Sequence, residues 1–148
     1  LKGHDTKAPL DIEADRIEVQ DRADRALFTG NVRVRQGNMA LDAARLRVAY
    51  RNAAGSNLEV LRVDADGGMR LKSPSEDARS DSGVYDVERR IVTMVGGVRL
   101  NRGQSTLTGQ RLVIDLDSGR STLDGGAVQG GNGGRVTGRF VVPQRDNP

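Results

Sequence analysis

The chain of 148 residues contains no cysteine, no tryptophan and only one histidine, His4. Without cysteine it can form neither a disulfide framework nor a thiolate metal site. A lone histidine close to the start of the chain leaves no Ser-His or Cys-His pair for nucleophilic catalysis. The glycines lead into strand patterns rather than helix N-termini, so no phosphate-binding loop is recognisable. We therefore expect a protein that is not an enzyme and has no catalytic residues, metal or cofactor.

Aromatic residues make up only 3% of the chain, namely Phe28, Tyr50, Tyr85 and Phe140. Sugar platforms and single-strand nucleic-acid binders stack their ligands on aromatic rings, so neither class is favoured and we expect no nucleic-acid partner. No apolar run approaches the roughly 18 residues of a membrane span. No signal peptide is recognisable and the first residue is Leu1, so we expect a mature or trimmed chain.

Charge of either sign is nearly balanced, with 23 basic against 20 acidic side chains and a net charge of +3. Lysine occurs only at positions 2, 7 and 72, and every other basic residue is arginine. One interpretation is a solvated face with a genomic bias toward arginine. The other is an anionic partner, because guanidinium forks suit phosphate and carboxylate groups. Both interpretations stay open.

A strand unit that begins with glycine repeats along the chain. Gly-Asn-Val-Arg-Val at 30–34 recurs as Gly-Gly-Met-Arg-Leu at 67–71, Gly-Gly-Val-Arg-Leu at 96–100 and, faintly, Gly-Gly-Ala-Val-Gln at 125–129. The first and third copies belong to longer matching stretches, in which Asp15 also corresponds to Asp81. A period near 30 residues is typical of one supersecondary unit stacked on copies of itself.

Apolar and polar residues alternate with period two through most of the chain, as in half-buried strands. Turn residues separate these runs, and no stretch has helical spacing with caps. We predict an all-β chain forming one domain over 1–148, with flexible ends at 1–8 and 144–148. Unpaired edge strands are expected at 10–19 and 135–142, and such edges recruit other chains.

Two pairs of carboxylates, Asp64 with Asp66 and Asp115 with Asp117, lie two residues apart on the polar side of predicted strands. They make a polysaccharide-active enzyme an alternative, although solubilising residues beside turns show the same pattern. The apolar face of the predicted strands suggests a different function, because aliphatic side chains with few aromatics suit a groove for acyl chains. Each methylene buried there would contribute about 0.8 kcal/mol.

Three segments carry a resemblance to a known family. Two of them are residues 9–15, Pro-Leu-Asp-Ile-Glu-Ala-Asp, and residues 28–37, Phe-Thr-Gly-Asn-Val-Arg-Val-Arg-Gln-Gly. The first resembles the opening strand of the LptA/OstA family, and the second resembles its signature hairpin. Residues 43–50 are similar to the strand that follows. A second copy at 95–103 and the closing 135–143 extend the resemblance over residues 5 to 143. The missing membrane anchor and the C-terminal strand with its short tail favour the LptA type over the LptC type and the LptD N-terminal domain.

The resemblance implies a periplasmic lipopolysaccharide-binding bridge between the inner and outer membranes. Its fold would be an open β-jelly roll of about sixteen antiparallel strands in two stacked sheets. Lipid A acyl chains would lie in the apolar interior, and protomers would join head to tail. LptC-type and LptD-type partners would bind through the edge strands. The residues expected to contact lipid are Leu10, Ile12, Val32, Val34, Met69, Leu71, Tyr85, Val87, Val98 and Leu100.

Outward arginines are candidates for phosphate contact at the mouth of the groove, namely Arg33, Arg35, Arg70 and Arg99. On this hypothesis Ile12→Asp or Leu71→Asp leaves the protein soluble but stops lipid loading. A structural β-solenoid or adhesin-type scaffold, with a fully packed core and no lipid, remains the alternative.

Overall fold

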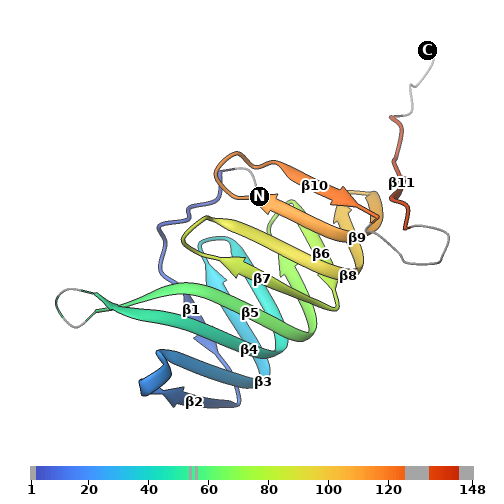
Figure 1. The fold of residues 1–148 in the computed structure, drawn as a ribbon. Helices are drawn as coiled ribbons and strands as arrows, with labels where there is room; N and C mark the ends of the chain where they lie inside the picture. The colour runs from blue at the N-terminus through green and yellow to red at the C-terminus, as the bar shows by residue number, and fades with distance from the viewer. Residues whose placement is uncertain (1–2, 54, 56, 126–133, 144–148) are drawn as a thin grey trace.

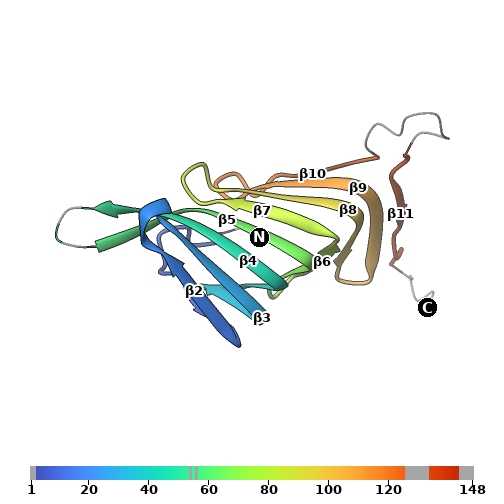
Figure 2. The same ribbon diagram turned by 60° about the horizontal axis from the view of Figure 1, so that its bottom comes forward.

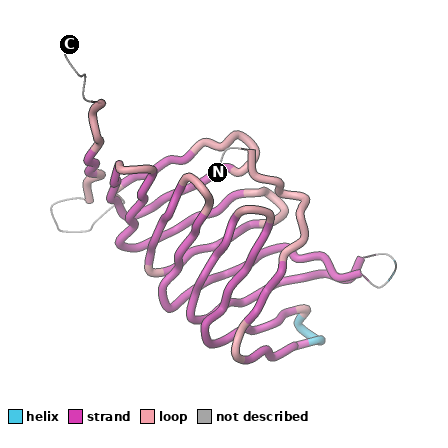
Figure 3. Tube along the Cα trace, turned by 180° about the vertical axis from the view of Figure 1, so that it is seen from behind, coloured by secondary structure: helices cyan, strands magenta, loops and turns pink. Residues whose placement is uncertain are grey.

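The computed structural model describes residues 3–53, 55, 57–125 and 134–143. The fourth copy of the repeat, at 125–129, and the tail at 144–148 therefore lie mostly or wholly outside the described residues. Figure 3 shows that nearly the whole described trace is strand, with one helical turn, η1 (Asp21–Ala23). The predicted all-β fold is confirmed.

Within the described residues, eleven antiparallel strands form the sheet, whose arrangement is seen in Figure 1. In chain order they are β1 (Asp11–Glu13), β2 (Arg16–Gln20), β3 (Arg25–Gln36), β4 (Met39–Ala53), β5 (Asn57–Lys72), β6 (Glu76–Ser80), β7 (Ser82–Asp86), β8 (Ile91–Arg102), β9 (Ser105–Asp115), β10 (Ser121–Asp124) and β11 (Thr137–Arg139).

The sheet folds over on itself into two layers, because its long strands pair with different partners at their two ends. The first half of β3 pairs with β2 and its second half with β1. Likewise β5 pairs first with β7 and then with β6, and β9 pairs first with β11 and then with β10. Layer A contains β1, β6 and β11, and layer B contains β2, β7 and β10. The resulting roll is seen along two directions in Figures 1 and 2.

The part of the chain that the structure describes has 11 strands, whereas the resemblance implied about sixteen. The reason is that β3, β4, β5, β8 and β9 each continue through the bend and serve both layers. Register shifts mark the bends, for example between Thr29 and Val32 in β3 and between Val95 and Val98 in β8. The two-layer jelly-roll architecture is therefore the expected one, built from fewer and longer strands.

The repeated glycines form these bends. Gly30 and Gly96 both have φ in the left-handed region, at +82° and +88°. The carbonyl of each accepts a hydrogen bond from an aspartate N–H, that of Asp15 at Gly30 and that of Asp81 at Gly96, both 2.9 Å long. The 66-residue correspondence read from the sequence thus describes two equivalent corners of the roll. A side chain at either glycine would meet both the unfavourable φ and the aspartate.

The core lies between the layers, in rows of apolar side chains that face each other across successive strands. In layer A one row passes through Ile12, Val34, Leu41, Leu71, Ala78, Leu100 and Leu107. In layer B one row passes through Val19, Ala26, Val48, Val63, Tyr85, Val92 and Ile114. Cross-strand neighbours of this kind stabilise sheets by direct contact.

Candidate functional site

All ten residues predicted to contact lipid face the space between the layers. Val32, Val34, Met69, Leu71, Tyr85, Val98 and Leu100 are buried, each with 4% or less of its surface exposed. Leu10, Ile12 and Val87 are partly buried and pack against this core. The middle of the roll is consequently filled by its own side chains, so a lipid could enter it only if the layers separated or side chains moved.

A polar bridge joins the two layers on the side of the roll opposite the glycine bends, which we call its open side. The Tyr85 hydroxyl, from layer B, donates a 2.6 Å hydrogen bond to Oε1 of Gln36, at the end of β3 in layer A. Nε2 of the same glutamine donates to the carbonyls of Thr6 and Ala8, and Oε1 also contacts the His4 ring nitrogen. Gln36 therefore holds the N-terminal segment across the gap between the layers. Burial raises the pKa of Tyr85 above its usual value.

The open part of the interior lies at the β2 end of the roll. A cavity of about 380 Å³ is found there, between β2, β3, β4 and β5. Ile17, Val19 and Leu58 on its rim are 54%, 55% and 62% exposed. Ile12, Ala26, Phe28, Val48, Tyr50 and Val60 continue the apolar wall inward, and Asp21, Asp24 and Asn52 add polar groups. The cavity is the accessible end of the apolar rows that run through the roll.

Sequence reasoning did not select the residues of this rim. The Arg-Ile-Glu-Val-Gln run of β2 does alternate with period two, which places Ile17 and Val19 on one side. Alternation alone cannot distinguish an inward position that is covered by the opposite layer from one at an open end.

The roll ends in strands that are paired on one side. In the described residues β2 pairs only with β3, and β10 pairs only with β9. At the C-terminal end β11 is likewise added to β9, and the residues after it, Phe140, Val141 and Val142, are 65%, 56% and 69% exposed. Unpaired backbone groups and exposed apolar side chains of this kind are suited to pairing with another strand.

The arginines predicted to contact phosphate lie on the outer face of layer A. Arg33 makes two hydrogen bonds to Asp42, of 2.6 and 3.0 Å, and Arg70 makes two to Asp77, of 3.0 and 2.7 Å. Arg35 is 4.0 Å from Glu13, and Arg99 lies opposite Arg79 on the neighbouring strand. Sequence reasoning omitted Arg79, whose place beside Arg70 and Arg99 depends on the pairing of β6.

The two carboxylate pairs lie in ion pairs or turns. Asp64 is bound by Arg62 and Asp66 by Arg45 on the outer face of layer B. Asp117 is bound by Arg90, and Asp115 accepts backbone N–H groups of the turn that follows β9.

Within the described ranges no cluster of three or more His, Cys, Asp or Glu residues could hold a metal ion. No helix in that part of the chain is long and apolar enough to cross a membrane.

The model of the family described as LptA/(LptD N-terminal domain) LPS transport protein matches residues 11–120. An uncharacterised protein of Rhizobium meliloti (strain 1021) is 33% identical over 128 residues, covering 82% of this chain and 69% of that protein. The LPS-assembly protein LptD of Yersinia enterocolitica is 30% identical over 156 aligned residues, covering 99% of this chain. The match spans only 19% of that LptD.

Among solved structures, LptH of Pseudomonas aeruginosa superposes with a TM-score of 0.78 at 16% identity. The superposition covers 94% of this chain and 99% of LptH, which is described as the LptA homologous periplasmic component of a lipopolysaccharide transport device. At this identity the likeness establishes the shared fold. Together with the family match over most of the two-layer roll, it shows that this chain belongs to the LptA/LptD N-terminal-domain family of lipopolysaccharide transport proteins.

Proposed function

We propose that this chain is a non-enzymatic, periplasmic bridge subunit that shelters the acyl chains of lipopolysaccharide in its apolar interior. The observation that carries the proposal is the cavity of about 380 Å³ at the β2 end, whose walls are mainly aliphatic. Acyl chains would enter there, because the middle of the roll is packed. Burial of each methylene contributes about 0.8 kcal/mol, so even a short stretch of chain would be held.

The proposal extends to assembly through the end strands. Protomers would pair head to tail, the β10 and β11 end of one against the β2 end of the next, so that their interiors line up. LptC-type and LptD-type partners of the same fold would occupy the free ends. Such a contact joins two different surfaces and does not close on itself, so it extends with concentration. Light scattering should show a mass that rises with protein concentration, and a constant monomer mass would contradict this part.

Lipid entry is tested by matched substitutions of valine. Val19→Asp places a charge on the cavity wall, and Val95→Asp places the same charge on the outer face of layer B. Both side chains are already about half exposed, at 55% and 45%, so both variants should fold. Native mass spectrometry with purified lipopolysaccharide should show adducts for the parent chain and Val95→Asp, and far fewer for Val19→Asp.

A simple phospholipid serves as the selectivity control in the same measurement. If Val19→Asp and Val95→Asp load equally, the cavity is not the entrance. If neither lipid binds the parent chain, the packed scaffold is the better interpretation. The Leu71→Asp variant proposed from the sequence is a poor test, because Leu71 is 3% exposed and a charge there would unfold the roll.

A further inference from the structure

Three arginines face each other on neighbouring strands of layer A. Arg70 of β5 is directly opposite Arg79 of β6, and Arg79 is directly opposite Arg99 of β8. Side chains at directly opposed positions have Cβ atoms about 5 Å apart, and like charges placed there destabilise a sheet. The row is therefore electrostatically unfavourable unless negative charge lies beside it.

The carboxylates of this face neutralise only part of the row. Arg33 is bound by Asp42, and Arg70 is bound by Asp77. Among the residues that the structure describes, neither Arg79 nor Arg99 forms an ion pair. The residue directly opposite Asp77 is Lys72, so this one carboxylate lies near several cations. The hydrogen bonds from Arg70 lower the pKa of Asp77, with smaller contributions from Arg79 and Lys72.

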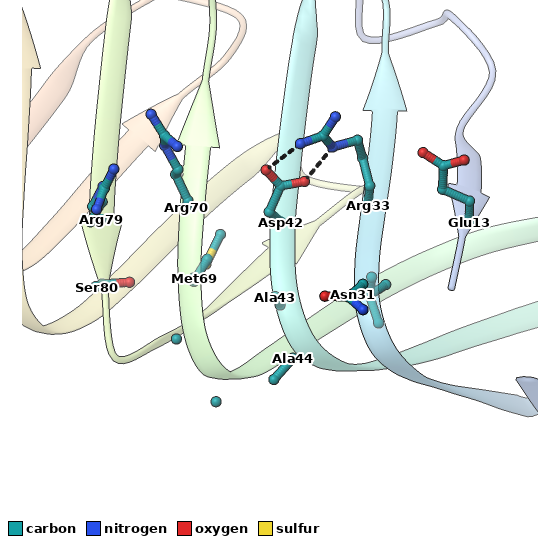
Figure 4. Close-up of a pocket in the computed structure, with 13 residues that line it drawn as sticks. Glu13, Asn31, Arg33, Asp42, Ala43, Ala44, Met69, Arg70, Arg79 and Ser80 are labelled. Atoms are coloured by element: carbon teal, nitrogen blue, oxygen red, sulfur yellow. Dashed lines mark hydrogen bonds and ion pairs between the residues drawn. The ribbon is translucent and has the colours of Figure 1, made fainter. Parts of the chain in front are cut away.

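A hollow adjoins the row on the outer surface (Figure 4). Its volume is about 730 Å³, and its uncharged lining combines small residues with larger ones, namely Ala43, Ala44, Gly67, Gly68, Ser80, Asn31, Val32 and Met69. Arg70 and Arg79 stand side by side along it, while Arg33 is turned onto Asp42. Glu13 and Asp42 line the β1 side. An anion would consequently lie at the Arg79 end, away from these carboxylates.

We propose that Arg79 and Arg99, with Arg70 as a third contact, bind a phosphate group on the outer face of layer A. Guanidinium groups bind tetrahedral oxyanions through paired N–H donors, and several of them converging on one anion remove their mutual repulsion. The inference does not depend on lipid in the interior, since this face lies on the other side of the layer. The phosphate is either free or carried on a sugar headgroup, and both present the same oxygens.

The first test is titration of the full chain with inorganic phosphate at low ionic strength, followed by NMR or calorimetry. The double variant Arg79→Gln/Arg99→Gln should bind about tenfold or more weakly, because it removes two guanidinium groups that donate charged hydrogen bonds to the anion. Arg47→Gln, on the outer face of layer B, changes another exposed arginine and should leave the affinity unchanged. Asp77→Asn should strengthen binding, since it releases Arg70 from its carboxylate.

The second arm compares lipopolysaccharide with and without its phosphate groups against the same variants. The site would be assigned to a headgroup phosphate if inorganic phosphate does not bind, while lipopolysaccharide binds through its phosphate groups and needs Arg79 and Arg99. Equal losses of affinity in Arg47→Gln and in the double variant would overturn the site, because binding would then depend only on the net charge of the protein. Affinity for both ligands that is unchanged by the double variant would overturn it as well. Circular dichroism checks that each variant is folded. Val19→Asp changes the interior cavity and should leave phosphate binding on the outer face unchanged, so the two proposals can fail independently.

Discussion

The Tyr85 hydroxyl donates a hydrogen bond of 2.6 Å to Oε1 of Gln36, and this contact joins the two layers across the open side of the roll. Both side chains are buried, with 1% and 2% of their surfaces exposed. A buried polar pair of this kind is costly to break on one side only, because the remaining group keeps its desolvation penalty.

Substitution at this bridge should therefore lower stability unequally. Tyr85→Phe removes one donor while Gln36 keeps its other contacts, so the free energy of unfolding should fall by about 1 kcal/mol. Gln36→Leu also frees the Thr6 and Ala8 carbonyls and should cost more, about 2 kcal/mol or above. Urea unfolding measures both, with Tyr50→Phe as the tyrosine control. Equal losses in the two bridge variants would show that the N-terminal segment contributes nothing.

Alkaline pH should destabilise the roll. Burial raises the pKa of Tyr85 in the folded state above the usual value of about 10. Because the tyrosine of the unfolded chain ionises first, the contribution of Tyr85 to stability is fully present below about pH 10. It is lost as the pH rises through the raised pKa of the folded state.

The same experiment separates the two tyrosines of the chain. The pKa of Tyr50 is also raised, chiefly by burial and then by Asp21 and Asp24, so Tyr85→Phe should flatten the alkaline loss of stability only in part. Thermal melts at a series of pH values on both sides of the usual tyrosine pKa, which is about 10, measure how the melting temperature falls with pH. An unchanged slope in Tyr85→Phe would contradict the assignment.

The corner glycines Gly30 and Gly96 should be more sensitive to substitution than a positive-φ glycine with open space around it, such as Gly68. A Cβ at Gly30 or Gly96 would lie 2.5 Å from an aspartate Oδ2, whereas at Gly68 it would meet nothing within 4 Å. Gly68→Ala should cost only the backbone strain of about 1 kcal/mol. Gly30→Ala and Gly96→Ala should each cost clearly more, as measured by chemical unfolding. Similar losses at all three positions would mean that the aspartates move aside freely.

Acid should weaken the Arg70–Asp77 pair. The hydrogen bonds from Arg70 hold the pKa of Asp77 below its ordinary value of about 3.9, so the pair stabilises the fold above that pH and the contribution disappears as pH falls through the lowered pKa. Asp77→Asn should be less stable than the parent at pH 7, by no more than about 1 kcal/mol because the pair is partly exposed. The difference between the two chains should shrink as the pH falls below the ordinary aspartate pKa of about 3.9 and through the lowered pKa of Asp77. A difference that persists there would point to lost packing instead.

The sequence was sufficient for the all-β class and for the side of the sheet that the residues of the long strands face, but not for the strand bounds: the edge strand expected at 10–19 is two strands, β1 and β2, and that expected at 135–142 is strand only at Thr137–Arg139. Period-two alternation placed Val34, Leu71 and Leu100 inward and Arg33, Arg70 and Arg99 outward, because successive side chains in a strand point to opposite faces. The repeated glycines marked the bends, because glycine adopts the left-handed φ at low cost. Family resemblance then supplied the two-layer architecture.

Only the tertiary structure decided which inward positions are covered and which outward charges meet. Gln36 is buried because Tyr85, 49 residues away, reaches it from the other layer. Ile17 and Val19 remain exposed because β2 is the last strand of its layer. Arg79 joins Arg70 and Arg99 because β6 lies between β5 and β8. Alternation fixes the direction of a side chain along its own strand, whereas these neighbours depend on long-range pairing between strands, which a local pattern does not contain.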